Sequence, residues 1–469
     1  MASESTRRDF LKISAVGLAA SASAKQVSAL PQNRTVNVWV TDDTTKCSPA
    51  KPIQWTNAAA GTSVLVTLKP DIRRQSILGF GGAFTDAACF MMNRLSTDAR
   101  AKLLHEMFHP SEMALSVCRT CIGASDYSTE VFSYDEGDPD PELARFSIDH
   151  DKKYVLPILR EARVLNPDLF LFSSPWSPPG WMKAGGSMLG GSMRRRYLRV
   201  YADYFIKFLQ SYAAEGAPVG AITTQNEVDT DQDGRMPACI WPQEYEIEFI
   251  KLLGPKIAEQ KLPTKIWLLD HNYNLWGRAS CSLEDVGLRK FCNDIAWHGY
   301  VGQAEMIKKV KDEFPDVGMH WTEGGPDYTS PDYLTDWTHW TKVFSEAMHN
   351  GCESITAWNL ALDEKGRPNI GPFPCGGIVT IHSESLEVTR SGQFWALMHF
   401  SRFIHRGATC MESQCADSGV HHIFLQNADG TNIAVIGNSG EARSVSLQLG
   451  NLITEVPLRK NAIATLMWH

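Results

Sequence analysis

Eight short apolar runs, spaced through the middle of the chain, constrain its fold more than any other feature. Each is rich in aliphatic and aromatic residues and is bounded by polar or glycine-containing segments. Runs of this kind are typical of strands that are buried on both faces of a parallel sheet. The predicted strands cover residues 77–84, 115–122, 169–174, 221–225, 265–270, 294–298, 318–322 and 354–360.

A segment with helical periodicity follows each predicted strand. The clearest is 197–214, where Tyr201, Phe205, Phe208 and Tyr212 lie along one side of a helix. The predicted helices cover residues 98–108, 151–165, 197–214, 244–259, 283–291, 304–314, 335–349 and 393–404. Eight strands, each followed by a helix, indicate an α/β fold of the (β/α)8 barrel type, or TIM barrel. Active sites of such barrels lie on the loops at the carboxyl ends of the strands.

The segments on either side of this alternation predict a small β-domain. Residues 36–40 and 62–68 alternate like half-exposed strands, and the chain after residue 404 is typical of hairpins, with Asp429-Gly430 as a tight-turn signal. We expect strands from both chain ends to pair in one β-sandwich. The predicted layout in chain order is an export signal in 1–24, sandwich strands in 25–76, the barrel in 77–404 and further sandwich strands in 405–469.

The first 24 residues are typical of a bacterial export signal. Arg7-Arg8 precedes a Phe-Leu-Lys run at 10–12, an apolar stretch over 13–22 and a small-x-small pattern at 22–24. The apolar stretch is shorter than the ~20 residues that a membrane-spanning helix needs. We therefore expect export by the twin-arginine route, cleavage near Lys25, and a mature protein in the periplasm or outside the cell without a membrane span.

Charge and composition bear on the possible partners. The chain has 45 Lys and Arg against 53 Asp and Glu, a net charge of −8, which argues against a nucleic-acid partner.

The chain also has 14 tryptophans, which either fill the core or form a surface that stacks against sugar rings. Five of them lie at or near predicted strand ends: Trp176, Trp181, Trp297, Trp321 and Trp358. The 11 cysteines are scattered, and we expect buried thiols and assign no disulfide.

One motif points to a different chemistry. His105-Glu106-Met107-Phe108-His109 fits the HExxH pattern of zinc proteases, which places two imidazoles on one helix face. However, Pro110 ends this helix at once, no third ligand lies nearby, and a barrel places the helix on the outer ring. A zinc hydrolase is therefore the lesser alternative, and we expect that no metal or organic cofactor is needed.

Two of the apolar strands run into a glutamate. The fourth predicted strand leads to Glu227 and the seventh to Glu323, three β/α units apart, so that the side chains can face each other across the barrel mouth. Two facing carboxylates are what glycoside hydrolysis requires, since one donates a proton to the leaving oxygen while the other attacks. Glutamates in rim salt bridges are the alternative, but the Asn226-Glu227 pair and the matching strand-end positions favour catalysis.

Seven stretches in chain order resemble glycoside hydrolase family 30, whose best-known member type is glucosylceramidase. They are GFGGAFTDAA at 79–88, IGASDYS at 122–128, SSPWSPPGWMK at 173–183, TTQNEVD at 223–229, WHGY at 297–300, WTEGG at 321–325 and AWNLALDEKGRPN at 357–369. The resemblance implies a (β/α)8 barrel, a β-sandwich from both chain ends, and a retaining β-glycosidase without a cofactor.

The resemblance also implies roles for individual side chains. Glu227 would be the acid/base, with a raised pKa, and Glu323 the nucleophile, with a lowered pKa. The other implied roles are Asn226 for the sugar 2-hydroxyl, Asp126 and Trp176 for the outer hydroxyls, Trp358 as the apolar platform, Tyr300 as a donor to Glu323, Arg119 as support for that charge, and His298 beside the acid/base.

The substrate is less constrained than the reaction. The resemblance implies a β-glucoside, carried by a glycolipid or an oligosaccharide, with glucosylceramidase-like hydrolysis as the first expectation. β-1,6-Glucanase, β-xylosidase and β-fucosidase are the alternatives within the family, and a sugar-binding protein without turnover is the non-enzyme alternative. The chain departs from many members at Val228, where they have proline, and in the loop after Asn369. Both segments border the leaving-group side.

Overall fold

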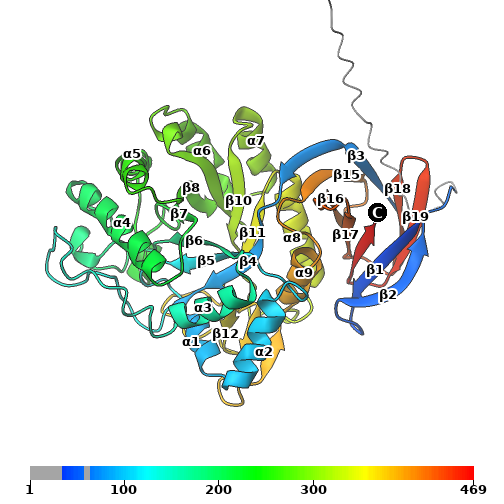
Figure 1. Ribbon diagram of the computed structural model, residues 1–469, viewed down its shortest axis with the longest axis horizontal. Coiled ribbons are helices and arrows are strands. Elements are labelled where there is room, and N and C mark those ends of the chain that lie inside the picture. The colour runs from blue at the N-terminus through cyan, green and yellow to red at the C-terminus, as the bar shows by residue number, and fades with distance from the viewer. Residues whose placement is uncertain (1–33, 58–63) are drawn as a thin grey trace, which may run out of the picture.

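The computed structural model describes residues 34–57 and 64–469. The predicted export segment, residues 1–24, lies outside these ranges and stays a prediction. Eight parallel strands close into a barrel, and a second, sheet-rich unit joins the two ends of the described chain (Figure 1). The predicted fold class is therefore confirmed: a (β/α)8 barrel with a β-domain formed from both chain ends.

The barrel strands are short and almost entirely buried, as the apolar runs predict. They are β4 (Gly79–Phe84), β5 (Val117–Cys121), β6 (Phe170–Ser174), β7 (Ala221–Thr223), β8 (Lys265–Asn272), β9 (Cys292–His298), β10 (Gly318–Glu323) and β11 (Ser354–Ala357). The pairing of β11 with β4 closes the ring. Inside it, Phe172 and Trp267 pack together with their ring centroids 4.8 Å apart, so the barrel is a filled core.

Helices cover the outside of the barrel. They are α1 (Asp86–Asn93), α2 (Thr97–Phe108), α3 (Val155–Leu165), α4 (Leu198–Ala214), α5 (Gln243–Glu259), α6 (Trp276–Leu283), α7 (Glu305–Glu313), α8 (Trp337–His349) and α9 (Gly392–Ser401). The prediction of a helix over 283–291 was wrong, because α6 ends at Leu283 and only one 3-10 turn (Leu288–Lys290) follows before β9. Asp285 Oδ1 accepts the N–H groups of Gly287 and Leu288, which favours a turn at that point.

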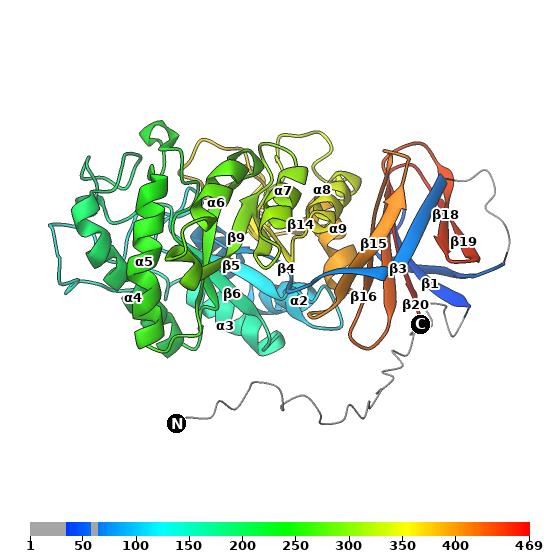
Figure 2. The same cartoon turned by 90° about the horizontal axis from the view of Figure 1, so that it is seen from above.

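The β-domain is one nine-stranded sheet that wraps around a second core (Figure 2). Its strands are β1 (Thr35–Thr41), β2 (Ser48–Gln54), β3 (Val64–Ser76), β15 (Thr409–Cys415), β16 (Val420–Gln426), β17 (Asn432–Asn438), β18 (Arg443–Leu449), β19 (Leu452–Leu458) and β20 (Ala462–Trp468). β1 pairs with β20, and β3 pairs with β15 and β18. The expected pairing of early with late strands is thus confirmed, and a bridge between Thr56 and Ile453 brings the sheet ends together.

The two units are joined by β3, which extends from the sheet toward the barrel, and by α8 and α9, which lie between them (Figure 2). Trp337 Nε1 on α8 donates to Asn461 O at 2.7 Å, and both nitrogens of the buried His399 on α9 contact threonine hydroxyls of the sheet. A small sheet of β12 (Ala361–Leu362), β13 (Val379–Ile381) and β14 (Val388–Arg390) follows the last barrel strand. Within the described residues, every helix is too short or too polar to cross a membrane.

Candidate active site

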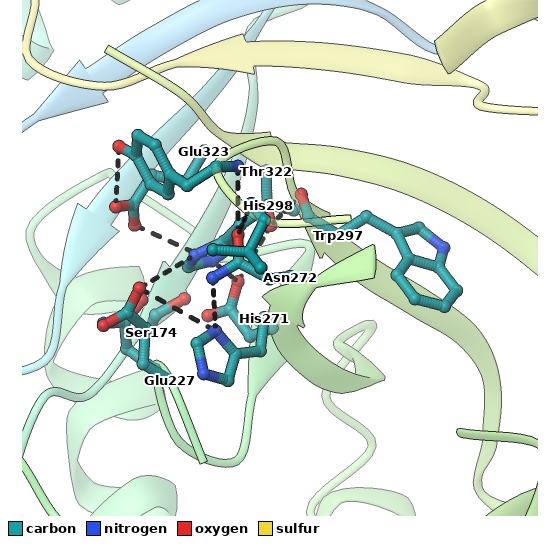
Figure 3. Close-up of polar contacts among 12 residues, drawn as sticks. Ser174, Glu227, His271, Asn272, Trp297, His298, Thr322 and Glu323 are labelled. Carbon is teal, nitrogen blue, oxygen red and sulfur yellow. Dashed lines mark hydrogen bonds and ion pairs between the residues drawn. The ribbon is translucent and has the colours of Figure 1, made fainter. Parts of the chain in front are cut away.

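A cleft of about 560 Å³ opens at the carboxyl ends of the barrel strands. Seven of the nine side chains predicted for the site line it: Asp126, Trp176, Asn226, Glu227, Tyr300, Glu323 and Trp358. The other two are fully buried: Arg119 contacts Glu323. His298 lies between Glu323 and Glu227 (Figure 3). The structure therefore brings together all nine residues, which come from strand ends far apart in the sequence.

The backbone around the cleft is irregular where it carries polar side chains. Glu227, Asp270 and Asn359 have left-handed backbone angles, with φ of 52°, 50° and 55°. The pairing of β8 with β9 shifts register between Leu269 and His271, and β10 shifts against β9 just before Glu323. Such bulges and strained residues re-aim side chains at functional sites. This is how consecutive residues of an otherwise buried strand end can face the cleft.

Arg119 holds the carboxylate of Glu323 in place. Its Nη1 donates to Glu323 Oε2, while Nη2 donates to Asn226 Oδ1 at 2.8 Å and to Asp270 Oδ2 at 2.7 Å. Tyr300 donates its hydroxyl to the other oxygen of Glu323, Oε1, at 3.1 Å. The contacts expected of Arg119 and Tyr300 are therefore present, and Glu323 presents a fixed, doubly hydrogen-bonded carboxylate to the cleft.

Asp270 is a central residue of the site that the sequence analysis did not include among the site residues. It is fully buried, accepts from Arg119, Thr223 and Thr322, and lies 3.0 Å from His298 Nε2. Burial alone would raise the pKa of this carboxyl, but Arg119 and then His298 lower it far below its usual range. Its sequence signal is a carboxylate at the end of the apolar run 265–270, the same signal that identified the two glutamates.

His298 lies between the two glutamates. Its Nδ1 is 3.6 Å from Glu227 Oε1, and its Nε2 is 3.7 Å from Glu323 Oε2. Burial would lower the pKa of this imidazole, but the surrounding carboxylates of Glu323, Asp270 and Glu227 raise it to about 9. At neutral pH, His298 is therefore a buried cation that both glutamates share.

The pKa directions expected for the two glutamates are reversed in the free cleft. Burial would raise the pKa of Glu227, but His298, His271 and Gln232 bring it below its ordinary value. Burial raises the pKa of Glu323, although His298 and Arg119 act against this. The physical reason is the charge on His298, which stabilises the Glu227 carboxylate directly. In the free cleft the proton that an acid/base needs thus lies on the neighbouring imidazole.

The side chains expected to bind the sugar form an aromatic wall beside a buried carboxyl group. Trp176 and Trp358 stack with ring centroids 5.1 Å apart and an interplanar angle of 18°, and the Arg119 guanidinium lies 4.7 Å from the Trp176 ring centre. Beside them, Asp126 Oδ1 is buried, and the described part of the chain offers it no hydrogen-bond partner. Burial, Glu323 and Glu227 raise the pKa of Asp126 well above its ordinary value. An orphaned carboxyl beside an indole wall is suited to a ligand with hydroxyl groups.

Not every tryptophan near the strand ends belongs to the cleft. Trp181, Trp297 and Trp321 pack into the main core, so only Trp176 and Trp358 of the five line the cleft. The loop after Asn369 reaches the mouth through Phe373, Pro374 and Cys375. This segment therefore forms part of the cleft mouth.

The HExxH motif does not assemble a metal site. His105 and His109 stack on the outside of the barrel, with ring centroids 4.3 Å apart, while Glu106 pairs with Arg390 instead of approaching them. Across residues 34–57 and 64–469, the sole group of three closely spaced ligand atoms belongs to Glu227, His271 and His298. The zinc-hydrolase alternative based on the motif is therefore wrong.

Comparison with known proteins assigns the family. Residues 77–404 match the sequence model of the glycosyl hydrolase family 30 TIM-barrel domain. The chain belongs to glycosyl hydrolase family 30. As a member of family 30 it is a glycoside hydrolase with a carbohydrate substrate. The expected family membership and the expected enzyme class are thus confirmed.

Relatives within family 30 carry two kinds of name. An endo-1,6-β-D-glucanase of Neurospora crassa is 30% identical, over 79% of this chain and 80% of that protein. A putative glucosylceramidase 3 of Caenorhabditis elegans is 32% identical, over 74% of this chain and 70% of that protein. Among solved structures, SrfJ of Salmonella typhimurium has a TM-score of 0.89 at 26% identity, covering 93% of this chain and 99% of that one. An endo-β-1,6-glucanase has a TM-score of 0.83 at 25% identity, covering 92% and 99%.

Proposed function

We propose that the chain is a retaining β-glycosidase that hydrolyses β-linked glucosyl groups by double displacement. Glu323 attacks the anomeric carbon and forms a glycosyl ester, while Glu227 gives its proton to the departing oxygen. Glu227 then takes a proton from water, the water oxygen replaces Glu323 at the anomeric carbon, and a β-configured sugar leaves. The observation that carries this proposal is the Glu323 carboxylate, fixed by Arg119 and Tyr300 at the cleft and facing Glu227 across the shared His298.

The hydrogen bonds around Glu323 support its role as nucleophile. Arg119 and Tyr300 each donate to one of its oxygens, and hydrogen bonds to the charged form favour the charged form. Arg119 also holds Asn226 by its carbonyl oxygen, which turns the amide NH2 group away from the guanidinium. That NH2 group is then available to donate to a sugar 2-hydroxyl, an interaction that strengthens in the transition state.

The charge on His298 supports the role of Glu227 as acid/base. A substrate that fills the cleft displaces water from Glu227, and desolvation raises the pKa of a carboxyl group. The proton on His298 lies beside Glu227 Oε1, with 3.6 Å between the heavy atoms. We infer that substrate binding moves this proton onto Glu227, which then holds it for the leaving group.

Apolar side chains at the mouth of the cleft favour an apolar leaving group of the kind found in glucosylceramide. Val301 and Phe373 line the mouth and are 52% and 38% exposed, and Tyr300 is 43% exposed beside them. Exposed apolar side chains around a polar pocket are typical of a binding surface for an apolar ligand. The putative glucosylceramidase among the relatives agrees with this choice.

A β-1,6-glucan is the second candidate substrate, and a separate observation favours it. A neighbouring groove of about 480 Å³ shares Tyr300, Pro326 and Asp327 with the cleft and continues to Trp340. This groove has room for a further sugar unit beyond the cleaved bond. Two endo-1,6-β-glucanases, one by sequence and one by structure, are among the similar proteins.

Hydrolysis of a substrate panel tests the proposal. The panel contains nitrophenyl α- and β-glucosides, the β-xyloside and β-fucoside, β-1,6-glucan and glucosylceramide in detergent. We expect cleavage of the β-glucoside but not the α-glucoside. The ratio of kcat/KM for glucosylceramide to that for glucan decides between the two leaving groups.

Replacement of the proposed nucleophile tests its role, and Glu323→Gln should lower kcat by about 10³-fold or more. The matched control Glu284→Gln, on an exposed loop, should leave kcat unchanged. Normal turnover by Glu323→Gln would contradict the assignment.

A further inference from the structure

Two imidazoles, one lining the cleft and one buried beneath it, point the same nitrogen at one carboxylate oxygen. His271 Nδ1 lies 3.8 Å and His298 Nδ1 lies 3.6 Å from Glu227 Oε1, and dashed lines join them in Figure 3. Hydrogen bonds between nitrogen and oxygen span about 2.7–3.2 Å, so both distances are too long for one. His298 Nδ1 is moreover buried without a hydrogen-bond partner among residues 34–57 and 64–469. An orphaned nitrogen in a fully buried side chain calls for an explanation.

The spacing of these three atoms is close to that of ligands around a metal ion. All three lie within 4.8 Å of one another. A tetrahedral Zn²⁺ with bonds of about 2.0–2.1 Å separates its ligand atoms by about 3.3 Å. The two separations from Glu227 Oε1, 3.6 and 3.8 Å, approach this value, and the two imidazole nitrogens lie no more than 4.8 Å apart, so small side-chain movements would bring the three atoms around one ion. Two histidines and one glutamate, with a fourth position open, form a common zinc ligand set.

The outer nitrogen of each histidine is held by a carboxylate. His271 Nε2 lies 2.5 Å from Asp229 Oδ1, and His298 Nε2 lies 3.0 Å from Asp270 Oδ1. Carboxylate–histidine–metal chains of this kind orient the ring and make the inner nitrogen a better donor of its lone pair. Both aspartates therefore hold their partner with Nδ1 toward Glu227.

A contact that competes with a metal shows which nitrogen of His271 carries the lone pair. Asn272 Nδ2 lies 3.3 Å from His271 Nδ1, and the same amide accepts the N–H groups of Tyr300 and Val301 through its oxygen. Those two bonds fix the amide so that its NH2 group faces the ring. Nδ1 is thus the acceptor nitrogen of His271, as metal binding requires.

We propose that Glu227, His271 and His298 bind Zn²⁺, or another divalent ion that prefers nitrogen and oxygen ligands, and that the bound ion inhibits the enzyme. Coordination of Glu227 Oε1 occupies the oxygen that would carry the catalytic proton. A metal also has to displace the proton from His298, because only neutral imidazole binds it. The inhibitory part of this proposal rests on the proposed function, whereas the binding part does not.

Calorimetric titration of the full chain with Zn²⁺ tests the binding, at one slightly alkaline pH. We expect His271→Gln to weaken Zn²⁺ binding by at least about tenfold, and Asp229→Asn by about 10- to 100-fold, because the latter removes only the orienting carboxylate. Asp229 is half exposed, so its variant tests the site even if the His271 variant fails to fold. The matched control is His105→Gln, which removes the stacked surface pair His105/His109 and should leave the affinity unchanged.

Inhibition is measured on the same proteins as the ratio of activity with and without Zn²⁺. The inhibition constants should follow the affinities from calorimetry, and a chelator should restore activity. The proposed site would be overturned if both His271→Gln and Asp229→Asn bound Zn²⁺ with wild-type affinity. It would also be overturned if only His105→Gln lost binding. An active enzyme that binds Zn²⁺ without inhibition would overturn the proposed effect. If the protein binds Zn²⁺ with the expected variant pattern but cleaves no glycoside, the site stands and only the proposed function fails.

Discussion

Asp270 couples the charges on which the active site depends. It faces Arg119 on one side and His298 on the other, and these two cations contact Glu323 and Glu227 in turn. Each buried charge is therefore paired, which is the condition for keeping it ionised in a low-dielectric site. Asp270 touches no part of the cleft and acts as a positioning residue for both glutamates.

Replacing Asp270 by asparagine should change the pH dependence as well as the rate. Without this carboxylate the imidazolium of His298 loses one of its stabilising charges, so its pKa falls from about 9. We expect the alkaline limb of the kcat profile to move to lower pH and kcat to fall by about 10- to 100-fold. Asp316→Asn, which alters a surface pair with Arg289, is the matched control. A lower rate with an unmoved pH profile would show that Asp270 matters only for folding.

At the scale of single elements, strand β4 shows how tightly the barrel is closed. A Cβ atom added to Gly81 would lie 1.8 Å from Val117 O of the neighbouring strand, which no backbone adjustment within the sheet can relieve. Gly79 and Gly81 therefore allow β4 to approach the chain at Ser116 and Val117. In contrast, a Cβ on Gly277 of α6 would meet nothing within 4 Å.

These two glycines give a matched pair of stability predictions. Gly81→Ala should destabilise the fold by more than about 4 kcal/mol, or prevent folding, because the clash is with a main-chain atom. Gly277→Ala should raise the free energy of unfolding by up to about 1 kcal/mol, because alanine favours the helix. Urea unfolding followed by circular dichroism measures both. A folded Gly81→Ala protein with wild-type stability would contradict the described pairing of β4 and β5.

The sequence predicted the barrel strands better than the residues at their carboxyl ends. The short apolar runs located all eight barrel strands, and the carboxylates at the strand ends located Glu227 and Glu323. The same signal applied to Asp270, but the sequence alone could not separate a positioning carboxylate from a surface one. His271 was missed because it faces the cleft only through the register shift after Leu269, and such a bulge has no sequence signature. The helix at 283–291 was wrong because Asp285 favours a turn there.

At the scale of the whole molecule, the barrel and the β-domain meet at buried histidines. His399 on α9 contacts Thr465 and Thr41 hydroxyls, both at 2.8 Å, and no carboxylate is among its hydrogen-bond partners in the described part of the chain. Burial and then Arg402 lower the pKa of His399 to about 3. Burial likewise lowers the pKa of His422 to about 3 and that of His421 to about 4, both on β16. The junction therefore holds neutral imidazoles.

This junction should lose stability in acid. In the unfolded chain His399 takes up a proton near its ordinary pKa of 6.5, but in the folded protein it does so only near 3. The contribution of His399 to the free energy of unfolding is thus fully present above about pH 6.5, and it falls by about 1.4 kcal/mol for each pH unit below that value. We expect the urea concentration at the unfolding midpoint to fall as the pH is lowered from about 7.5 to about 5.5, and to fall less steeply in His399→Gln than in the wild-type protein. His105→Gln, on the outer surface, should keep the wild-type slope, and an equal slope in His399→Gln would contradict the explanation.

The most direct test of the double-displacement mechanism is to identify the residue that becomes glycosylated. A 2-fluoro-β-glucoside with a good leaving group forms the glycosyl ester but hydrolyses slowly, so peptide mass spectrometry can locate the sugar. We predict one labelled peptide, with the sugar on Glu323, and no label in Glu323→Gln. A sugar on Glu227, or turnover that releases the α-anomer without any labelled peptide, would contradict the assignment of the two glutamates.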